Sequence, residues 1–257
     1  MTTDNPSFSL AGRKALVTGA SRGIGQALAV GLARAGADVA VAARGSESLA
    51  ATLEAVRAAG RRAHGLALDV RDAAAMGRGV AAAGDALGGL DILVNNAGVE
   101  EVRDSLAVDE ALWDRILDTN LKGAFFCAQA AARLMADGSG GAILNVCSLT
   151  SEVGVPTAVP YGSSKSGLLG MTRALAAEWA GRAIRVNAIG PGYFRTDLTE
   201  VFYRDPAWQD AMLAKIPLRR FGRLEDLVGA AVFLCSDAAA YVTGQCLYID
   251  GGYMASI

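Results

Sequence analysis

The stretch Lys14-Ala15-Leu16-Val17-Thr18-Gly19-Ala20-Ser21-Arg22-Gly23-Ile24-Gly25 decides the fold. It opens with a short apolar run typical of a buried strand, and a helical pattern follows from Gln26 through Gly36. Strand, glycine turn and helix in this order predict a turn that binds the phosphates of a dinucleotide at the helix N-terminus. Gly19 permits the tight turn, Gly23 lets the backbone approach a pyrophosphate, and Gly25 lets the helix pack closely.

The alternation of strand and helix continues along the whole chain. Further strands are expected at 38–44, 63–68, 91–94, 141–146, 184–189 and 245–249. Helices are expected at 47–59, 73–87 with Asp72 as the N-cap, 109–137, 161–180 and 225–234. The sequence therefore predicts an α/β fold, with one Rossmann-like domain over residues 1–257. Its core is a doubly wound, parallel, seven-stranded sheet with helices on both faces.

Composition narrows the class of protein. The chain has 257 residues, of which 52% are hydrophobic, and a net charge of -2, which gives no reason to expect nucleic acid or an anionic membrane as partner. The opening residues 1–6 lack the basic and apolar regions of a signal peptide, and no apolar run reaches the roughly 18 residues of a membrane span. We expect a cytoplasmic protein.

Cysteine and histidine usage argues against metal and triad chemistry. Cys127, Cys147, Cys235 and Cys246 form no CxxC pair, and we expect small buried thiols in a reducing compartment. The one histidine, His64, lies in an apolar stretch, where we expect a structural role. A metal site built on histidine and cysteine has little support, and a Ser-His-Asp triad is improbable.

The strongest chemical signal is Tyr161-Gly162-Ser163-Ser164-Lys165. Tyrosine and lysine four residues apart lie on one face of a helix. A free phenol has a pKa of about 10, and a nearby ammonium lowers that pKa toward the range useful for general acid–base catalysis. Alone, this spacing is a weak signal, because an ordinary surface pair would show it too.

Cofactor choice is suggested by the end of the second predicted strand. A fold of this kind that prefers NAD usually carries Asp or Glu there, whereas this chain has Ala43 and then Arg44. Together with Arg22 in the glycine turn, Arg44 would suit the 2′-phosphate of NADP. Asp69 and Val70 follow the third strand, where they could meet adenine.

At this point the chain resembles the short-chain dehydrogenase/reductase family, from about Leu10 to Tyr253. The matching elements are TGASRGIG (18–25), NNAG (95–98), Asn120, Ser148, YGSSK (161–165), PGYFRT (191–196) and DGG (250–252). Ser148 lies thirteen residues before Tyr161, which is the usual family spacing. Within the family, the runs at 146–152, 191–196 and 216–222 resemble gluconate 5-dehydrogenases, polyol dehydrogenases and 3-oxoacyl-carrier-protein reductases.

The resemblance implies specific roles. Tyr161 would pass the proton to or from the substrate oxygen, Lys165 would lower its pKa and bind the nicotinamide ribose, and Ser148 would hold the carbonyl. Asn120 would hold a water that links Lys165 to solvent. NADP, or in second place NAD, would carry the hydride chemistry. Residues expected to bind it are Gly19, Ser21, Arg22, Gly23, Ile24, Gly25, Arg44, Asp69, Val70, Asn96, Ala97, Gly98, Tyr161, Lys165, Pro191, Gly192, Phe194 and Thr196.

The substrate stays open between several classes. The family implies interconversion of a secondary alcohol and a ketone, here in a small polyol, sugar or sugar acid. A neutral compound is favoured by three carboxylates, Glu100, Glu101 and Glu152. The first two lie in the loop after 95–98, which tends to be basic in gluconate-type relatives. Arg103 and Arg195 could offset these charges. A 3-oxoacyl-carrier-protein reductase is the alternative enzyme, weakened because the helix end at 131–137 offers only one basic residue.

Two further expectations complete the interpretation. Residues 194–217 follow the sixth strand and are expected to form a substrate lid. The family also implies a homotetramer, for which small residues along 167–177 would permit close helix packing. A non-catalytic nucleotide-binding regulator is the alternative of another class, and it would be expected to lack Tyr161, Lys165 or Ser148.

Overall fold

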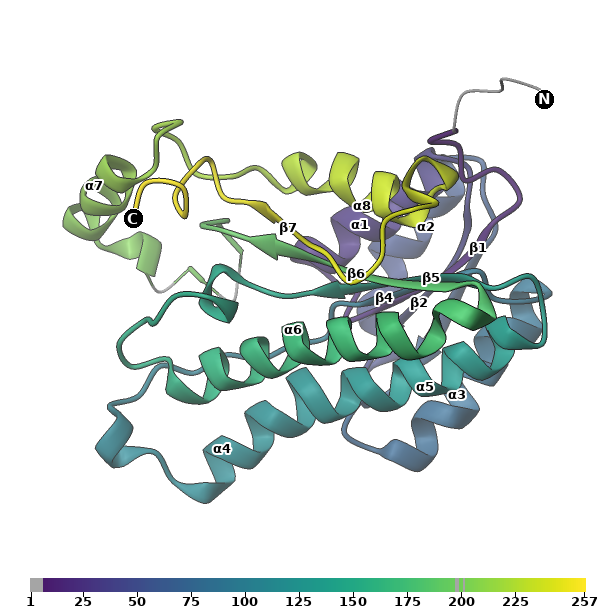
Figure 1. The fold of residues 1–257 in the computed structure, drawn as a ribbon, viewed down its shortest axis with the longest axis horizontal. Helices are drawn as coiled ribbons and strands as arrows, with labels where there is room; N and C mark the ends of the chain where they lie inside the picture. Colours follow the sequence, from purple (N-terminus) through teal and green to yellow (C-terminus); the bar gives the residue numbers. More distant parts are fainter. Residues whose placement is uncertain (1–6, 197–198, 201) are drawn as a thin grey trace.

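A computed structural model describes residues 7–196, 199–200 and 202–257. Its centre is one seven-stranded, fully parallel sheet of order β3-β2-β1-β4-β5-β6-β7 (Figure 1). The strands are β1 (Lys14–Thr18), β2 (Asp38–Ala43), β3 (Ala63–Ala67), β4 (Ile92–Asn95), β5 (Gly141–Val146), β6 (Ile184–Pro191) and β7 (Cys246–Ile249). The strand order reverses between β1 and β4, and such a switch point opens a crevice at the carboxyl ends of the strands.

Helices cover both faces of the sheet (Figure 1). They are α1 (Gly23–Arg34), α2 (Ala50–Ala58), α3 (Ala73–Leu87), α4 (Glu110–Leu117), α5 (Gly123–Ala136), α6 (Val159–Trp179), α7 (Pro206–Lys215) and α8 (Val228–Cys235). One core cluster joins the sheet to α1, α2 and α8, and a second joins it to α3, α5 and α6. The predicted fold class, a doubly wound parallel sheet, is confirmed.

Most predicted boundaries fall within two residues of the observed ones. The spans 14–18, 73–87 and 141–146 agree at both ends, and the Asp72 carboxylate accepts hydrogen bonds from the backbone of Ala74 and Ala75 as an N-cap. Two predicted helices begin instead as 3-10 turns, Ser46–Leu49 before α2 and Leu224–Leu227 before α8. Such 3-10 turns are frequent at the N-termini of α-helices.

The predicted helical stretch over 109–137 is confirmed, but it is not one regular α-helix. A π-helical turn, Asp118–Lys122, separates α4 from α5, although the axis continues across it (Figure 1). Asp109 is the N-cap of α4, and Asp137 is the C-cap of α5. The π turn contains Asn120, and such turns are frequent at functional sites.

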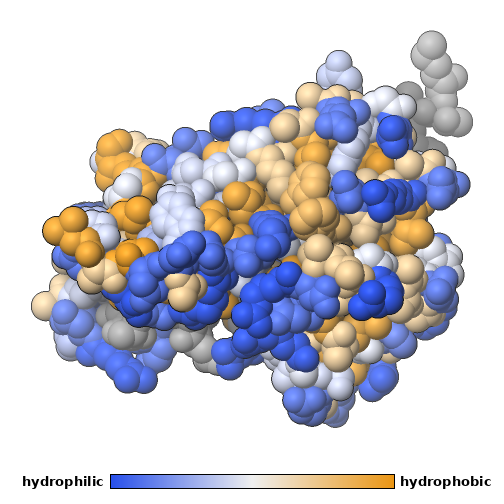
Figure 2. All heavy atoms as spheres, turned by 90° about the horizontal axis from the view of Figure 1, so that it is seen from below, coloured by the Kyte–Doolittle hydropathy of each residue, from blue (hydrophilic) through white to orange (hydrophobic). Residues whose placement is uncertain are grey.

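Large apolar side chains are exposed on the side of α4 and α5. Trp113 and Leu134 are more than a third exposed, and Leu106, just before α4, is almost fully exposed. Seen from that side, polar and apolar residues are interspersed on the surface (Figure 2). Among the described residues, no helix is both long and apolar enough to cross a membrane.

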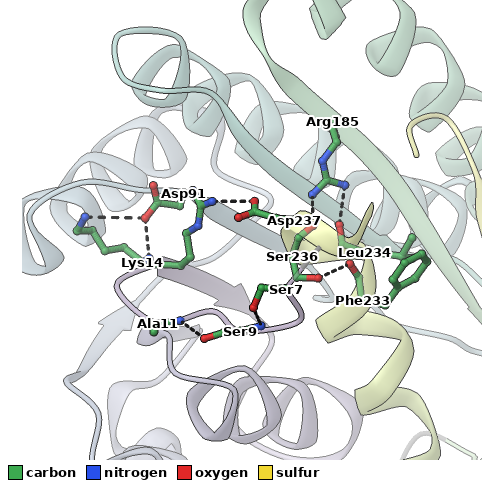
Figure 3. Close-up of polar contacts among 11 residues, drawn as sticks. Ser7, Ser9, Ala11, Lys14, Asp91, Arg185, Phe233, Leu234, Ser236 and Asp237 are labelled. Atoms are coloured by element: carbon green, nitrogen blue, oxygen red, sulfur yellow. Dashed lines mark hydrogen bonds and ion pairs between the residues drawn. The ribbon is translucent and has the colours of Figure 1, made fainter. Parts of the chain in front are cut away.

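A network of polar contacts closes the amino end of the sheet (Figure 3). The Asp91 carboxylate accepts from the backbone of Lys14 at 2.8 Å and ties the start of β1 to the start of β4. The half-buried Arg185 guanidinium donates to the carbonyls of Leu234 at 2.8 Å and Ser236 at 3.0 Å, which end α8. These contacts satisfy carbonyls that a helix terminus leaves without partners.

The cysteines largely follow expectation. Cys127, Cys147 and Cys235 are buried and free, but Cys246 on the edge strand β7 is only half-buried. An edge strand has one uncovered side, so the prediction of four buried thiols is wrong at this position.

Candidate active site

A cavity of about 840 Å³ lies at the carboxyl ends of the strands. A volume of this size is typical of sites that hold a small-molecule ligand or cofactor. Its wall includes all eighteen residues expected to bind a cofactor, together with Ser148. Asn120 is the one predicted site residue that does not line it.

The glycine turn between β1 and α1 forms one wall. Gly19 has a φ of +64°, and a Cβ there would lie 2.7 Å from the Cα of Ala97. A Cβ on Gly25 would lie 2.3 Å from the carbonyl oxygen of Gly19. The tight turn and close packing expected of these two glycines are confirmed, because any side chain would collide with backbone.

Asn96 holds that turn in place. Its side-chain amide donates to the carbonyls of Thr18 at 3.0 Å and Gly19 at 2.9 Å. The Thr18 hydroxyl in turn accepts from the backbone of Asn96 at 3.1 Å and of Ala97 at 3.2 Å. The ends of β1 and β4 are therefore locked together across the switch point.

The shape of this wall fits a dinucleotide. Helix α1 begins at Gly23 on the cavity wall, and no side chain caps its first turn. Uncapped backbone N–H groups at a helix N-terminus attract phosphate oxygens. A backbone cradle without side chains is what a pyrophosphate needs in order to approach the helix end.

Charged side chains surround the far end of the cavity. Arg22 and Arg44 are exposed on its wall, as the prediction for a 2′-phosphate requires. Asp69 pairs with Arg71 at 2.6 Å, and hydrogen bonds from this guanidinium lower the pKa of Asp69. Glu47 also lines the wall, a carboxylate that the sequence interpretation missed because it lies in the turn after β2 rather than at the strand end.

The inner end of the cavity gathers Ser148, Tyr161 and Lys165. Ser148 follows β5, and its hydroxyl is hydrogen-bonded to Tyr161 in the first turn of α6. Lys165, one helical turn further on, is 4% exposed, and its Nζ lies 5.6 Å from the centre of the Tyr161 ring. This Nζ donates to the carbonyl of Val146 at 2.7 Å.

The prediction that Tyr161 has a lowered pKa is wrong. Burial raises the pKa of Tyr161, and the nearby carboxylate of Glu100 raises it further. The hydrogen bond with Ser148 lowers it, but less than burial raises it. Burial also lowers the pKa of Lys165. In a low-dielectric pocket, desolvation outweighs the neighbouring charge on which the prediction rested.

Asn120 lies just behind this group. Its side-chain oxygen accepts from the backbone N–H of Val99 at 2.8 Å, and its amide donates to the carbonyl of Val99 at 2.9 Å. The amide also donates to the hydroxyl of Ser164 at 3.0 Å. Asn120 thus fixes the loop after β4 against α6, and its expected role in holding a water stays a prediction.

Aromatic side chains form the opposite wall. Tyr193, Tyr203 and Trp208 line the cavity, with ring centres 5.7 Å apart for Tyr193 and Trp208 and 5.2 Å apart for Tyr203 and Trp208. Part of the expected lid at 194–217, namely residues 197, 198 and 201, lies outside the described residues. Its closing motion stays a prediction.

Among the described residues, no three or more His, Cys, Asp and Glu side chains are arranged to hold a metal ion. The cavity wall contains two further groups that the sequence interpretation did not single out. The side-chain hydroxyls of Thr150 and Tyr203 are buried and have no hydrogen-bond partner in the described structure. No sequence pattern marks such groups, because their isolation depends on tertiary packing.

Comparison with known proteins agrees with this geometry. The family model described as "Enoyl-(Acyl carrier protein) reductase" matches residues 19–254. The chain belongs to the short-chain dehydrogenase/reductase family. This member is 42% identical over 250 residues to the gluconate 5-dehydrogenase of Gluconobacter oxydans (strain 621H), covering 97% of this chain and 98% of the relative. It is 40% identical over 241 residues to the 3-oxoacyl-[acyl-carrier-protein] reductase FabG of Staphylococcus aureus (strain Mu50), covering 93% of this chain and 97% of the relative.

Solved structures of this dehydrogenase/reductase family superpose over nearly the whole chain. A Sinorhizobium meliloti 1021 protein assigned to the short-chain alcohol dehydrogenases is 68% identical, with a TM-score of 0.96 over 98% of this chain and 100% of that one. A gluconate 5-dehydrogenase from Burkholderia cenocepacia J2315, in complex with NADP and tartrate, is 38% identical. Its TM-score is 0.94 over 97% of this chain and 98% of that one. This chain is therefore an oxidoreductase of the family.

Proposed function

We propose that the enzyme interconverts a secondary alcohol and a ketone in a small polyhydroxylated compound, with NADP(H) as cofactor. The observation that carries this proposal is the meeting of Ser148, Tyr161 and Lys165 at the inner end of a cavity whose outer wall is a glycine phosphate turn. The sugar-acid dehydrogenases among the relatives support the substrate class.

The cofactor would lie along the glycine turn, with its phosphates at the start of α1 and its adenosine between Arg22, Arg44 and Asp69. When bound, it supplies hydride transfer to or from the reacting carbon. The protein contributes position and electrostatics. The Asn96 contacts keep the turn rigid, and Lys165 presents its ammonium beside the Tyr161 ring.

Proton transfer would fall to Tyr161. Its phenol donates a proton to the ketone oxygen during reduction and accepts one from the alcohol during oxidation. The Ser148 hydroxyl stabilises charge that develops on the same oxygen. Because burial and Glu100 raise the pKa of the unliganded Tyr161, proton donation is favoured near neutral pH and oxidation at alkaline pH.

Cofactor preference gives the first prediction. Replacing Ala43 by Asp and Arg44 by a neutral residue should shift preference toward NAD(H), because the new carboxylate binds ribose hydroxyls and repels a 2′-phosphate. Dissociation constants for both cofactors, measured by fluorescence titration, check this. Tighter NAD(H) than NADP(H) binding by the unmodified enzyme would overturn the proposed cofactor and would mean that Arg44 points into solvent.

The substrate class is tested with a panel of alditols, the matching aldonates and a 3-ketoacyl thioester, each assayed with both cofactors. We expect the highest kcat/KM for a polyhydroxylated compound. A clear preference for the thioester would replace this proposal by the acyl-carrier reductase function, which the FabG relative favours. Turnover of any of these compounds would eliminate a purely regulatory role.

We further propose that the enzyme is a cytoplasmic homotetramer. The absence of a membrane-spanning helix among the described residues is consistent with this location. The exposed Trp113 and Leu134 on α4 and α5 offer apolar surface to a second copy. Sedimentation equilibrium is the test of assembly.

A further inference from the structure

Three carboxylates stand near the catalytic group in the sequence, and the structure separates them. Glu101 forms ion pairs with Arg103 and Arg115 and does not line the cavity. Glu152 is exposed and pairs with Arg173 at 3.5 Å, also away from the cavity wall. Glu101 and Glu152 are therefore each paired with arginine and do not face the cavity.

Glu100 differs from both. It lines the cavity, and within the described part of the chain it has no ion-pair partner. Its place in the loop is fixed because Asn120 bonds both backbone groups of the preceding residue, Val99. Glu100 is close enough to Tyr161 and Lys165 to shift the pKa of each. A carboxylate on a fixed stretch of backbone thus lines the cavity. Burial raises the pKa of Glu100, and the Lys165 ammonium lowers it by less.

Each of three cationic side chains has a hydrogen-bond or ion-pair partner, and one of them, Arg195, does not line the cavity. Lys165 donates to the carbonyl of Val146, and Arg115 is held by Glu101. Arg195, in the loop after β6, pairs with Glu200 at 2.7 Å. The Lys165 ammonium has a carbonyl partner rather than a carboxylate, and it already interacts electrostatically with Glu100. A substrate carboxylate would therefore have to compete with Glu100 for this ammonium. Like charges in a poorly solvated pocket repel strongly.

Two residues of the cavity wall carry neutral hydroxyls. The Thr150 and Tyr203 hydroxyls are buried without partners in the described structure, and Tyr203 is only 4% exposed. A buried polar group without a partner is costly, and either side chain would have to turn before its oxygen could meet a ligand. Hydroxyl groups of a substrate can donate to the Glu100 carboxylate, which lines the cavity.

We propose that Glu100 is a specificity-determining residue. It accepts hydrogen bonds from the hydroxyls of an uncharged polyhydroxylated substrate and repels the carboxylate of the corresponding sugar acid. This inference rests on the proposed function and narrows it. The preferred substrate class is a neutral polyol or sugar, although the named relatives include sugar-acid dehydrogenases.

The test compares kcat/KM for C4–C6 alditols and their matched aldonates, using the full-length enzyme with NADP. Wild-type enzyme should favour the alditol by about tenfold or more, and Glu100→Gln should reduce that ratio by about tenfold, because the repulsion is removed. Glu100→Ala provides a second variant in case the amide misfolds. Glu152→Gln is the matched control and should leave the ratio unchanged, because neither Glu152 nor its partner Arg173 lines the cavity.

The outcomes separate the two proposals. If the wild type favours aldonates, or if neither Glu100 variant changes the ratio, the role of Glu100 is overturned while the proposed function stands. A wild type that turns over neither class overturns the proposed function, and the role of Glu100 falls with it.

Discussion

The two ends of the sheet treat their charged side chains in opposite ways. At the amino end, Asp91 and Arg185 are matched with backbone donors and acceptors, and the contacts tie strands and helix ends together (Figure 3). At the carboxyl end, Lys165 is buried with one carbonyl partner, and Glu100 faces a cavity without an ion pair in the described structure.

The difference indicates that one end of the sheet contributes mainly to stability and the other mainly to ligand binding. Satisfied polar groups at one end contribute to stability, because each removes the cost of a buried, unpaired carbonyl or charge. Incompletely paired groups at the other end cost stability and keep their bonding capacity for ligands. Strained or poorly paired active sites of this kind are the usual origin of a trade-off between stability and activity.

The largest expected effect is that of Lys165→Met, at the carboxyl end of the sheet. Turnover should fall by about 10²–10⁴-fold, because proton transfer and ribose binding lose their cation. A lysine whose pKa is lowered by folding costs stability in full below the folded-state pKa, and the cost fades as the pH rises from there to the higher pKa of the unfolded chain. At pH 7 the variant should therefore be within about 1 kcal/mol of wild type, or more stable.

Steady-state kinetics and urea unfolding of the same preparation check this. If the variant lost several kcal/mol of unfolding free energy, Lys165 would be a structural residue like Arg185. The proposed difference between the two ends of the sheet would then be wrong.

Arg185→Met, at the amino end, should have the opposite effect, because it should lower stability and leave turnover unchanged. It leaves the carbonyls of Leu234 and Ser236 without their donor, which should cost about 2–4 kcal/mol of unfolding free energy. The kcat per folded molecule should stay unchanged, since the residue is remote from the cavity. Arg185→Lys, which keeps the charge but offers fewer donors, should be intermediate. A large loss of kcat at full stability would contradict the comparison.

The pH profile gives the smallest effect. Alcohol oxidation requires Tyr161 to accept a proton, so its rate should rise with pH toward the raised pKa of that phenol. Glu100→Gln removes a negative charge that raises this pKa, and the alkaline limb of the profile should move to lower pH. The test is to compare the pH profiles of kcat/KM for the wild type and for Glu100→Gln. An alkaline limb that stays in place or moves to higher pH argues against electrostatic coupling between Glu100 and Tyr161.

The sequence was sufficient for the architecture and for most of the cavity wall. Short apolar strands, Asp72 as a cap and the glycine turn are local signals, and each appears where expected. All residues predicted to bind cofactor line one cavity because parallel strands place their carboxyl ends at one edge of the sheet.

What local patterns could not show depends on tertiary contacts. Helical periodicity continues through 109–137, so it could not reveal the π turn in which Asn120 reaches the backbone of Val99. Spacing placed Lys165 beside Tyr161 but did not measure burial, which reverses the predicted pKa shift. The sequence also could not show that Glu100 lines the cavity whereas its neighbour Glu101 forms ion pairs away from it.

The central claim, that Tyr161 is the proton donor and acceptor of this enzyme, is tested most directly with Tyr161→Phe. This change removes one hydroxyl and leaves the ring packing in place. We predict that NADPH binding, followed by fluorescence titration, stays within about twofold of wild type, while single-turnover reduction of the best ketone falls by about 10²–10⁴-fold. A variant that binds NADPH normally and retains near-normal turnover would contradict the account.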